Sequence, residues 1–198
     1  MNWVEPIKNR DKIARIKDNL RKKPRDYLLF VLGINVALRA SDLLQLRVSD
    51  VLDGDGMIRD QITVLESKRK KRRVISLSDS AKDAIAFYFN DAEWPDFPSD
   101  RFNRWLKWPL FFSQKDISKP ICRTQAYRLI KKWTSDVGLT GNYGTHSLRK
   151  TWAYWARKEG TAIDLIRQVL GHSREETTLR YVGISREEID QVFRSVNL

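Results

Sequence analysis

The two histidines of this chain each lie close in sequence to another residue that could act on a phosphate ester. His146 stands three residues before Arg149 in HSLRKTW, and His172 stands nine residues before Tyr181 in LGHSREETTLRY. A guanidinium can bind two phosphate oxygens at once, and a neutral imidazole can donate a hydrogen bond or take up a proton. A tyrosine can attack phosphorus, but its pKa of about 10 means that it needs a positive environment or a nearby base. These residue types therefore suit phosphodiester chemistry.

Two further cationic segments lie upstream, one with Arg39 in ALRASDLLQLR and one with Lys68 in ESKRKKRR. Together with the two histidine segments, they resemble the signature segments of the tyrosine recombinases (the phage integrase family) in order and in spacing. The resemblance extends from about Leu28 to about Arg194. Each short motif arises by chance in many proteins, whereas their joint occurrence in one order is specific. The sequence is therefore identified as a tyrosine recombinase catalytic domain.

The resemblance assigns six residues to catalysis: Arg39, Lys68, His146, Arg149, His172 and Tyr181. In the mechanism that it implies, Tyr181 attacks the phosphorus, the arginines and histidines bind the non-bridging oxygens, and His146 also accepts the tyrosine proton. Lys68 would give a proton to the departing 5′-oxygen. The product is a 3′-phosphotyrosyl link, which a second 5′-hydroxyl can reverse. Because the bond energy is conserved, we expect no ATP, no metal and no other cofactor.

The choice of Lys68 rests on the family's hairpin pattern of Lys, four residues, Arg, then Val/Leu-x-Pro-Leu. Lys68 to Arg73 followed by VISL matches this pattern, except that Ser76 replaces the usual proline. Lys70 is the alternative, because chemistry alone does not distinguish the cations of this run. Another departure is Asp42, where the family usually has Glu. The cations expected to contact DNA phosphates are Arg69, Lys70, Lys71, Arg72 and Lys150, the last standing where a His is frequent.

Each candidate residue also has an ordinary structural explanation. Arg39 could cap a helix or pair with Asp42, the two histidines could serve a helix cap and a turn, and Tyr181 could be a core aromatic. Taken singly, these explanations are the commoner ones. The coherence of the whole set favours catalysis.

Hydrophobic periodicity and turn residues predict the elements that would carry these side chains. Helices are expected over 6–23, 25–38, 78–89, 123–137, 146–158, 161–170 and 185–196, and a short helix is expected to start at an N-cap on Ser41. Capping boxes are predicted at Thr161 with Asp164 and at Ser185 with Glu188. Strands over 62–65 and 74–77 should form a hairpin with a basic tip, and 94–98 should be loop. The fold class is thus α+β, mostly helical, with a small antiparallel β-sheet.

Composition agrees with a nucleic-acid partner. The 37 Lys and Arg against 25 Asp and Glu give a net charge of +12, and 41% hydrophobic residues are enough for a core. The single cysteine, Cys122, excludes a disulfide within the chain and a zinc site built on several cysteines. The N-terminus has no apolar run, and no stretch approaches the ~18 apolar residues of a membrane span. We therefore expect a cytoplasmic, nucleoid-associated protein that binds double-stranded DNA.

Residues 1–198 are expected to form one catalytic domain without the N-terminal clamp domain of most family members. The chain is then either a fragment or naturally minimal, and Met1 favours the minimal form. Without that domain, one protomer would bind DNA weakly, and the assembly of several protomers would raise the affinity. We therefore expect a monomer or weak oligomer in solution and a homotetramer on DNA. The helix within 185–198 would dock on a neighbouring protomer or, equally well, pack on its own core.

Three other functions compete with site-specific recombination. A non-cleaving DNA-binding regulator on the same fold would not need all of the catalytic positions. A type IB topoisomerase-like enzyme would share the chemistry, but the short separation in sequence between His172 and Tyr181 favours a recombinase. A metal-dependent nuclease would need a cluster of carboxylates that the sequence does not offer.

Overall fold

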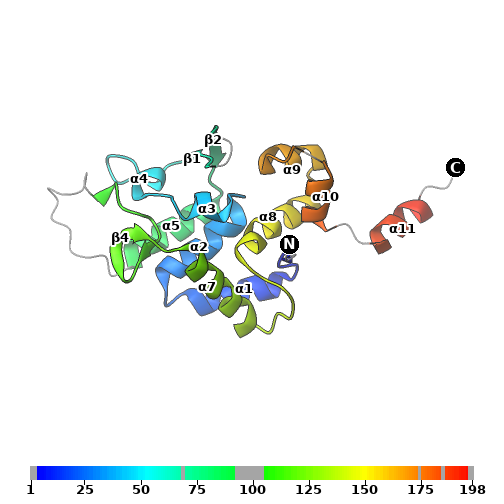
Figure 1. The fold of residues 1–198 in the computed structure, drawn as a ribbon, viewed down its shortest axis with the longest axis horizontal. Helices are drawn as coiled ribbons and strands as arrows, with labels where there is room; N and C mark the ends of the chain where they lie inside the picture. Colours follow the sequence, from blue (N-terminus) through cyan, green and yellow to red (C-terminus); the bar gives the residue numbers. More distant parts are fainter. Residues whose placement is uncertain (1–3, 68–69, 92–104, 174, 184–185, 196–198) are drawn as a thin grey trace.

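The computed structural model describes residues 4–67, 70–91, 105–173, 175–183 and 186–195 (Figure 1). Its helices are α1 (Arg10–Leu20), α2 (Pro24–Asn35), α3 (Ala40–Leu43), α4 (Val48–Val51), α5 (Asp79–Asp91), α7 (Arg123–Asp136), α8 (Thr145–Lys158), α9 (Ile163–Leu170), α10 (Glu175–Val182) and α11 (Arg186–Ser195). Its strands are β1 (Gln61–Leu65), β2 (Arg72–Ser76), β3 (Phe112–Ser113) and β4 (Asp116–Pro120). The expected α+β, mostly helical class is confirmed.

Helix α2 is the centre of the main core. It packs against α5 on one side and α8 on another, and five successive apolar side chains from Leu28 to Leu32 are at most 1% exposed. A helix that is apolar all round must be covered on every side. At Gly33 an added Cβ would collide with the Leu148 side chain, so glycine allows α2 and α8 to approach closely. The start of α8 is thereby fixed against the centre of the core.

The predicted hairpin is present. Strands β1 and β2 pair antiparallel with Ile62 opposite Ile75 and Val64 opposite Arg73. Side chains of β1 alternate between exposed and buried, and this alternation continues into Glu66, which is buried. A second antiparallel pair, β3–β4, was not predicted from the sequence, because its strands are short and polar.

The last third of the described chain forms a smaller unit on α8. Helices α9 and α10 pack on each other and on α8. Their apolar contacts form a separate cluster of Ala37, Ala153, Ile166, Leu170 and Val182. In Figure 1 these two helices lie together beside α8, whereas α11 lies apart from them.

Several predicted helix ends were wrong. The first helix starts at Arg10, because Asn9 is extended and caps it, and Ile7 instead donates its backbone N–H to the Thr151 hydroxyl. Pro24 opens α2 instead of only ending α1, as a proline can at the first helical position. Helix α2 ends at Asn35, three residues earlier than expected.

Two predicted N-caps were also wrong. Arg39, not Ser41, precedes the first residue of α3, and α9 starts after Ala162 without the Thr161 capping box. The predicted Ser185 cap, the 94–98 loop and the candidates Lys68 and Arg69 lie outside the described residues. Within the described chain, no helix is long and apolar enough to cross a membrane.

Candidate active site

Arg39 is placed by a sharp turn after α2. Val36 caps α2, and Ala37 then adopts a left-handed conformation with φ of +51°, which is uncommon outside glycine. The chain continues through an extended Arg39 into α3. The turn directs the Ala37 carbonyl toward α8 and leaves the Arg39 side chain 18% exposed. The Arg39 guanidinium is therefore held by the fold and remains partly accessible to a ligand.

Two carboxylates hold the Arg39 guanidinium. Its Nη1 lies 3.1 Å from Glu66 Oε1 and 3.8 Å from Asp42 Oδ2. Glu66 also pairs with Arg73 from β2 at 3.6 Å. Both acidic residues are at most 4% exposed, so these charges interact in a poorly solvated environment. The cluster contains two cations and two anions, and it fixes the hairpin relative to α3.

Asp42 also anchors the chain immediately before the predicted general acid. Its Oδ1 accepts hydrogen bonds from the backbone N–H of Ser67 at 3.1 Å and from the Ser67 hydroxyl at 2.6 Å. Ser67 is followed by Lys68, which lies outside the described residues. The assignment of Lys68 therefore stays a prediction, but the neighbouring residue is tied directly to the Arg39 helix.

Arg149 joins the turn before Arg39 to the turn before His172. It is 2% exposed, and its Nη1 donates to the Ala37 carbonyl at 2.7 Å while its Nη2 donates to the Leu170 carbonyl. Burial, followed by repulsion from Arg39, lowers the pKa of Arg149 to about 10, so it remains a cation at neutral pH. A guanidinium has five N–H donors, and three remain for a ligand after these two bonds.

His172 and Tyr181 meet through the fold of α9 and α10. Gly171 ends α9 in the left-handed conformation, and His172 Nδ1 lies 3.1 Å from the hydroxyl oxygen of the buried Thr178. The His172 and Tyr181 rings make an edge contact with centroids 4.7 Å apart. A Tyr181 phenolate would raise the pKa of Arg149, which places the phenol oxygen within electrostatic reach of that guanidinium.

His146 is the second residue of α8 and is half-buried. Its Nε2 lies 3.4 Å from Arg123 Nη2. Burial lowers the pKa of His146, and Arg123, Arg149, Lys150 and Arg39 lower it further. The imidazole is therefore neutral at pH 7, the form that can accept a proton.

Two buried N–H donors of this region, His146 Nδ1 and Arg149 Nε, make no hydrogen bond within the described residues. Arg39 Nη1 and Arg73 Nη1 differ from them, because both reach the Glu66 carboxylate as ion pairs. Buried donors are almost always satisfied in native structures, so a group of unsatisfied ones calls for an explanation. Both unsatisfied donors belong to side chains that can bind an anion, and a bound anion would satisfy them.

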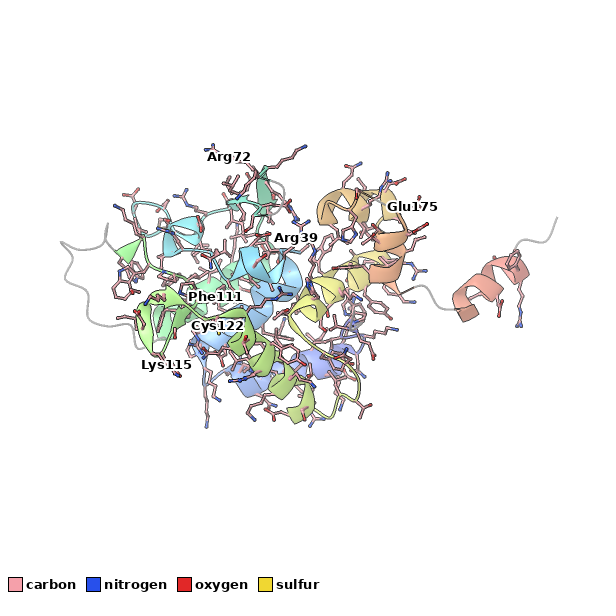
Figure 2. All side chains as sticks on the ribbon, viewed as in Figure 1. Arg39, Arg72, Phe111, Lys115, Cys122 and Glu175 are labelled. Atoms are coloured by element: carbon pink, nitrogen blue, oxygen red, sulfur yellow. The ribbon has the colours of Figure 1, made fainter. Side chains whose placement is uncertain are left out.

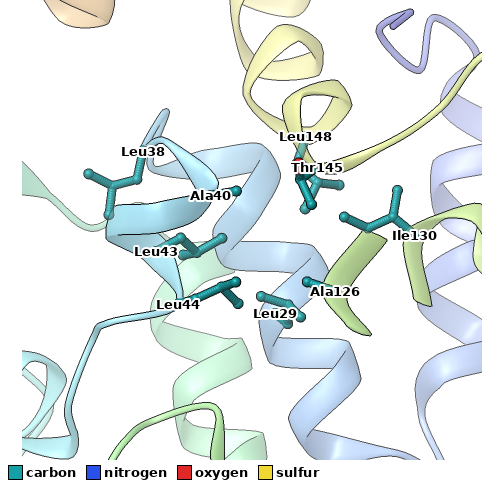
Figure 3. A pocket seen from close by; sticks show the side chains of 9 residues that line it. All are labelled: Leu29, Leu38, Ala40, Leu43, Leu44, Ala126, Ile130, Thr145 and Leu148. Atoms are coloured by element: carbon teal, nitrogen blue, oxygen red, sulfur yellow. The ribbon is translucent and has the colours of Figure 1, made fainter. Parts of the chain in front are cut away.

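A small apolar pocket lies beneath these residues (Figure 3). Leu38 and Ala40, which flank Arg39, line it together with Leu148, which precedes Arg149. Thr145, which precedes His146, lines it as well. Residues next in sequence to each of the three candidate residues are thus packed around one apolar pocket, and this packing helps to set their spacing.

The basic hairpin presents its described cations to solvent. Lys70, Lys71 and Arg72 are exposed, and Figure 2 shows Arg72 directed away from the body of the fold. Lys150 differs from them, because it is 4% exposed and points inward. The buried Lys150 is therefore poorly placed for the surface contact with DNA that the sequence predicted.

The sequence analysis missed two charged residues, Glu66 and Arg73, of the ion-pair cluster around Arg39. Glu66 carries a signal that could have found it, since it continues the buried phase of the alternating β1 strand. Arg73 was used only to align the hairpin, and its pairing with Glu66 depends on the strand register. Within the described ranges, no group of three or more His, Cys, Asp or Glu side chains could hold a metal ion.

Comparison with known proteins supports the same identification. A profile described as "Phage integrase family" matches residues 8–188. A Bacillus subtilis protein named probable integrase/recombinase YoeC is 37% identical over 188 residues, which are 94% of this chain and 93% of that protein. Tyrosine recombinase XerD of Oceanobacillus iheyensis is 25% identical over 185 residues, 93% of this chain but 59% of that protein. The chain therefore spans nearly all of one relative and about three fifths of the other.

Solved structures share the fold. The crystal structure of XerA recombinase aligns with a TM-score of 0.73 at 20% identity, over 98% of this chain and 66% of that chain. XerH recombinase in a post-cleavage complex with its palindromic difH substrate aligns with a TM-score of 0.72 at 18% identity, over 95% of this chain and 51% of that chain. With the family profile covering most of its length and a relative above 30% identity, this chain belongs to the phage integrase family of tyrosine recombinases.

Proposed function

We propose that this chain is a site-specific DNA recombinase that cuts and rejoins strands through a 3′-phosphotyrosyl intermediate, as in DNA integration, excision or inversion. The observation that supports this most is the pair of unsatisfied buried donors on His146 and Arg149, which lie within electrostatic reach of Arg39 and, for Arg149, of Tyr181. A phosphodiester is the anion that such a group would bind next to a tyrosine nucleophile. The family's curated relatives carry the names integrase and recombinase.

In the proposed reaction, the Tyr181 oxygen bonds to phosphorus as the bond from phosphorus to the 5′-oxygen breaks. The phenol proton passes to neutral His146, and Lys68 protonates the departing 5′-oxygen. Arg39, Arg149 and His172 bind the charge that grows on the non-bridging oxygens. Attack of another 5′-hydroxyl reverses these steps and reseals the strand. The phosphate bond energy is stored in the enzyme link, so the chemistry consumes no ATP and has no step that requires a metal.

Double-stranded DNA is the proposed substrate, and the basic hairpin is the proposed backbone contact. Lys70, Lys71 and Arg72 are exposed on one hairpin next to the Arg39 cluster. Phosphate contacts release counterions, so the affinity for DNA should fall steeply as salt is raised. Such binding would keep the protein on the nucleoid.

We propose further that residues 1–198 act as one catalytic domain and assemble as a homotetramer on DNA. Helix α11 provides a candidate contact between protomers, because its Phe193 is 76% exposed and no described residue of α11 joins either apolar cluster of the fold. Deleting residues 183–198 should abolish the pairing of two DNA sites while leaving single-site binding. Continued recombination by this truncated protein would contradict the role of α11.

Covalent trapping tests the central proposal. The protein is incubated in EDTA with a supercoiled plasmid carrying DNA from its own genomic neighbourhood, and adducts are sought on a denaturing gel beside Tyr181→Phe. We expect an adduct from the native protein and none from the variant. Tyr154→Phe is the matched control, since Tyr154 lies on α8 outside the cluster and should leave the adduct unchanged.

The same assay separates the competing functions. Binding without any adduct would favour a non-cleaving regulator. Relaxation of plasmids that does not depend on their sequence would favour a topoisomerase-like enzyme. Loss of all activity in EDTA would favour a metal-dependent nuclease.

A further inference from the structure

Lys150 occupies an unusual position between the nucleophile and the N-terminal segment. It follows Arg149 on α8 and is 4% exposed. Its Nζ donates a hydrogen bond to the Val4 carbonyl at 2.8 Å and lies 5.1 Å from the centroid of the Tyr181 ring. A buried ammonium needs compensation for its lost hydration, and here a carbonyl dipole and an aromatic face provide it.

The N-terminal segment that bears this carbonyl is itself fixed in place. Glu5 donates its backbone N–H to the Asn142 carbonyl at 2.8 Å, and Ile7 donates its own to the Thr151 hydroxyl at 2.8 Å. The Trp155 indole donates to the Ile7 carbonyl at 3.0 Å. The Val4 oxygen is thus held against α8 by bonds on its C-terminal side, and Lys150 has a fixed acceptor.

The Tyr181 ring is contacted by two charged or polar groups from different elements. The His172 ring meets it edge to face, and the Lys150 ammonium lies near its ring. The apolar cluster beneath α10 is small, so these contacts are a large part of what fixes the tyrosine. Removing one of them should widen the range of positions that the phenol oxygen occupies, and misplacement by a small distance slows a reaction strongly.

We propose that Lys150 is a positioning residue for the nucleophile: anchored on the Val4 carbonyl, its ammonium holds the Tyr181 ring in the attacking position. This inference rests on the proposed function, because it assigns Tyr181 the attacking role. It replaces the surface contact with DNA that the sequence suggested for Lys150.

The charge state of Lys150 allows this role near neutral pH. Burial lowers its pKa to about 8, so the ammonium form predominates at pH 7 and is lost at more alkaline pH. The ionisable groups that face it are Glu5 from the N-terminal segment, His146 from α8 and Tyr181 from α10. An arginine at this position would keep its charge over the whole range.

The test compares Lys150→Met and Lys150→Arg with the native protein on one defined duplex. The cleavage position is first mapped by trapping on genomic DNA, and the duplex is then made with either oxygen or sulfur as the 5′ leaving atom. A thiolate leaves without a proton donor, because its pKa is far below that of an alcohol. A defect on the nucleophile side therefore persists with sulfur, whereas a defect in protonating the leaving group disappears.

We expect Lys150→Met to bind the duplex as tightly as the native protein but to form the adduct about 3- to 30-fold more slowly, with oxygen and sulfur alike. Lys150→Arg should recover most of the rate at pH 7, and its rate relative to the native protein should rise between pH 7 and pH 9. The matched control is Lys158→Met, which removes an ammonium 5.9 Å from the Tyr154 ring on the same helix and should change nothing.

Three results would overturn the inference: an unchanged rate for Lys150→Met, a defect that sulfur removes, or a loss of DNA affinity that accounts for the whole defect. Thermal unfolding of each variant shows whether a slow rate reflects a damaged fold, and recovery by arginine separates charge from packing. If the native protein forms no adduct with any DNA, the proposed function itself fails, and Tyr181 has no attack for Lys150 to support.

Discussion

The two halves of the candidate site differ in how much core lies beneath them. Arg39, His146 and Arg149 are attached to α2, α3 and α8, which share the large core around Leu28. His172 lies in the turn between α9 and α10, Tyr181 lies on α10, and these two helices rest on a separate small cluster around Val182. The proposed phosphate-binding half is therefore held by extensive packing, whereas the proposed nucleophile is held by a small apolar cluster and by contacts with His172 and Lys150. The domain thus supports the two parts of the proposed site on apolar clusters of very different size.

Arg149→Lys should break the connection between the halves and have the largest effect on cleavage. A lysine keeps the charge but cannot bond both the Ala37 and Leu170 carbonyls in the geometry of a guanidinium. We expect adduct formation to fall about 10³-fold. Hydrogen exchange should quicken in α9 and α10 while α2 stays protected. Arg167→Lys, an exposed change on α9, serves as the control, and equal protection of both halves in Arg149→Lys would refute the connection.

Glu66→Gln should disturb the phosphate-binding half alone. It leaves Arg39 and Arg73 without their shared counter-charge while keeping the size of the side chain. We expect cleavage about 10- to 100-fold slower and a loss of roughly 1–3 kcal/mol in unfolding free energy, with normal protection of α10. The exposed Glu175→Gln is the matched control (Figure 2). Faster cleavage would instead show that the ion pair restrains Arg39 from binding phosphate.

Substitutions that remove apolar side chains from the two clusters should affect stability in different ways. Leu28→Ala in the large core should cost about 2–5 kcal/mol and lower the Tm of the whole domain. Val182→Ala in the small cluster should cost about 2 kcal/mol, felt mainly as faster exchange in α9 and α10. Denaturant unfolding and hydrogen exchange measure the two effects. A single shared transition with uniform loss of protection in both variants would show that the halves unfold as one.

The fall of the cleavage rate at acid pH should follow the protonation of His146. It should be the smallest of these effects. Burial and the neighbouring cations lower the pKa of His146, so the neutral imidazole persists below its ordinary value of about 6.5. The rate should therefore decline only at a pH below that value. Arg123→Gln removes one of these cations, so the midpoint of the acid limb should move upward. A midpoint that stays in place would assign the limb to another group.

The sequence predicted the fold class, the hairpin and the general order of the helices, because these depend on periodicity and turn residues that act locally. It did not predict the start of α1 or the C-terminal end of α2, where contacts with α8 take part. The left-handed Ala37 is an example, since its carbonyl is fixed by Arg149 more than a hundred residues away.

The sequence motifs predicted the residues of the candidate site, but not the side chains that hold those residues in place. Residue types and order indicated Arg39, His146, Arg149, His172 and Tyr181, and the structure brings these five together. The burial of Glu66 had only a weak signal in the sequence. The burial of Lys150 had none, because a lysine beside an arginine resembles a surface cation. Supporting contacts between distant segments require the three-dimensional register.

The bonds from Arg149 to two distant turns also have a consequence for how the protein is made. During synthesis the chain emerges from its N-terminal end, and domains tend to fold in that order. The segment of Arg39 is complete long before Leu170, His172 and Tyr181 leave the ribosome. A nascent chain at that stage would therefore hold Arg39 without His146, Arg149 or Tyr181, and so only part of the proposed site. On this view, the chromosome is exposed to a strand-breaking enzyme only after the segment from Arg149 to Tyr181 has been made and folded.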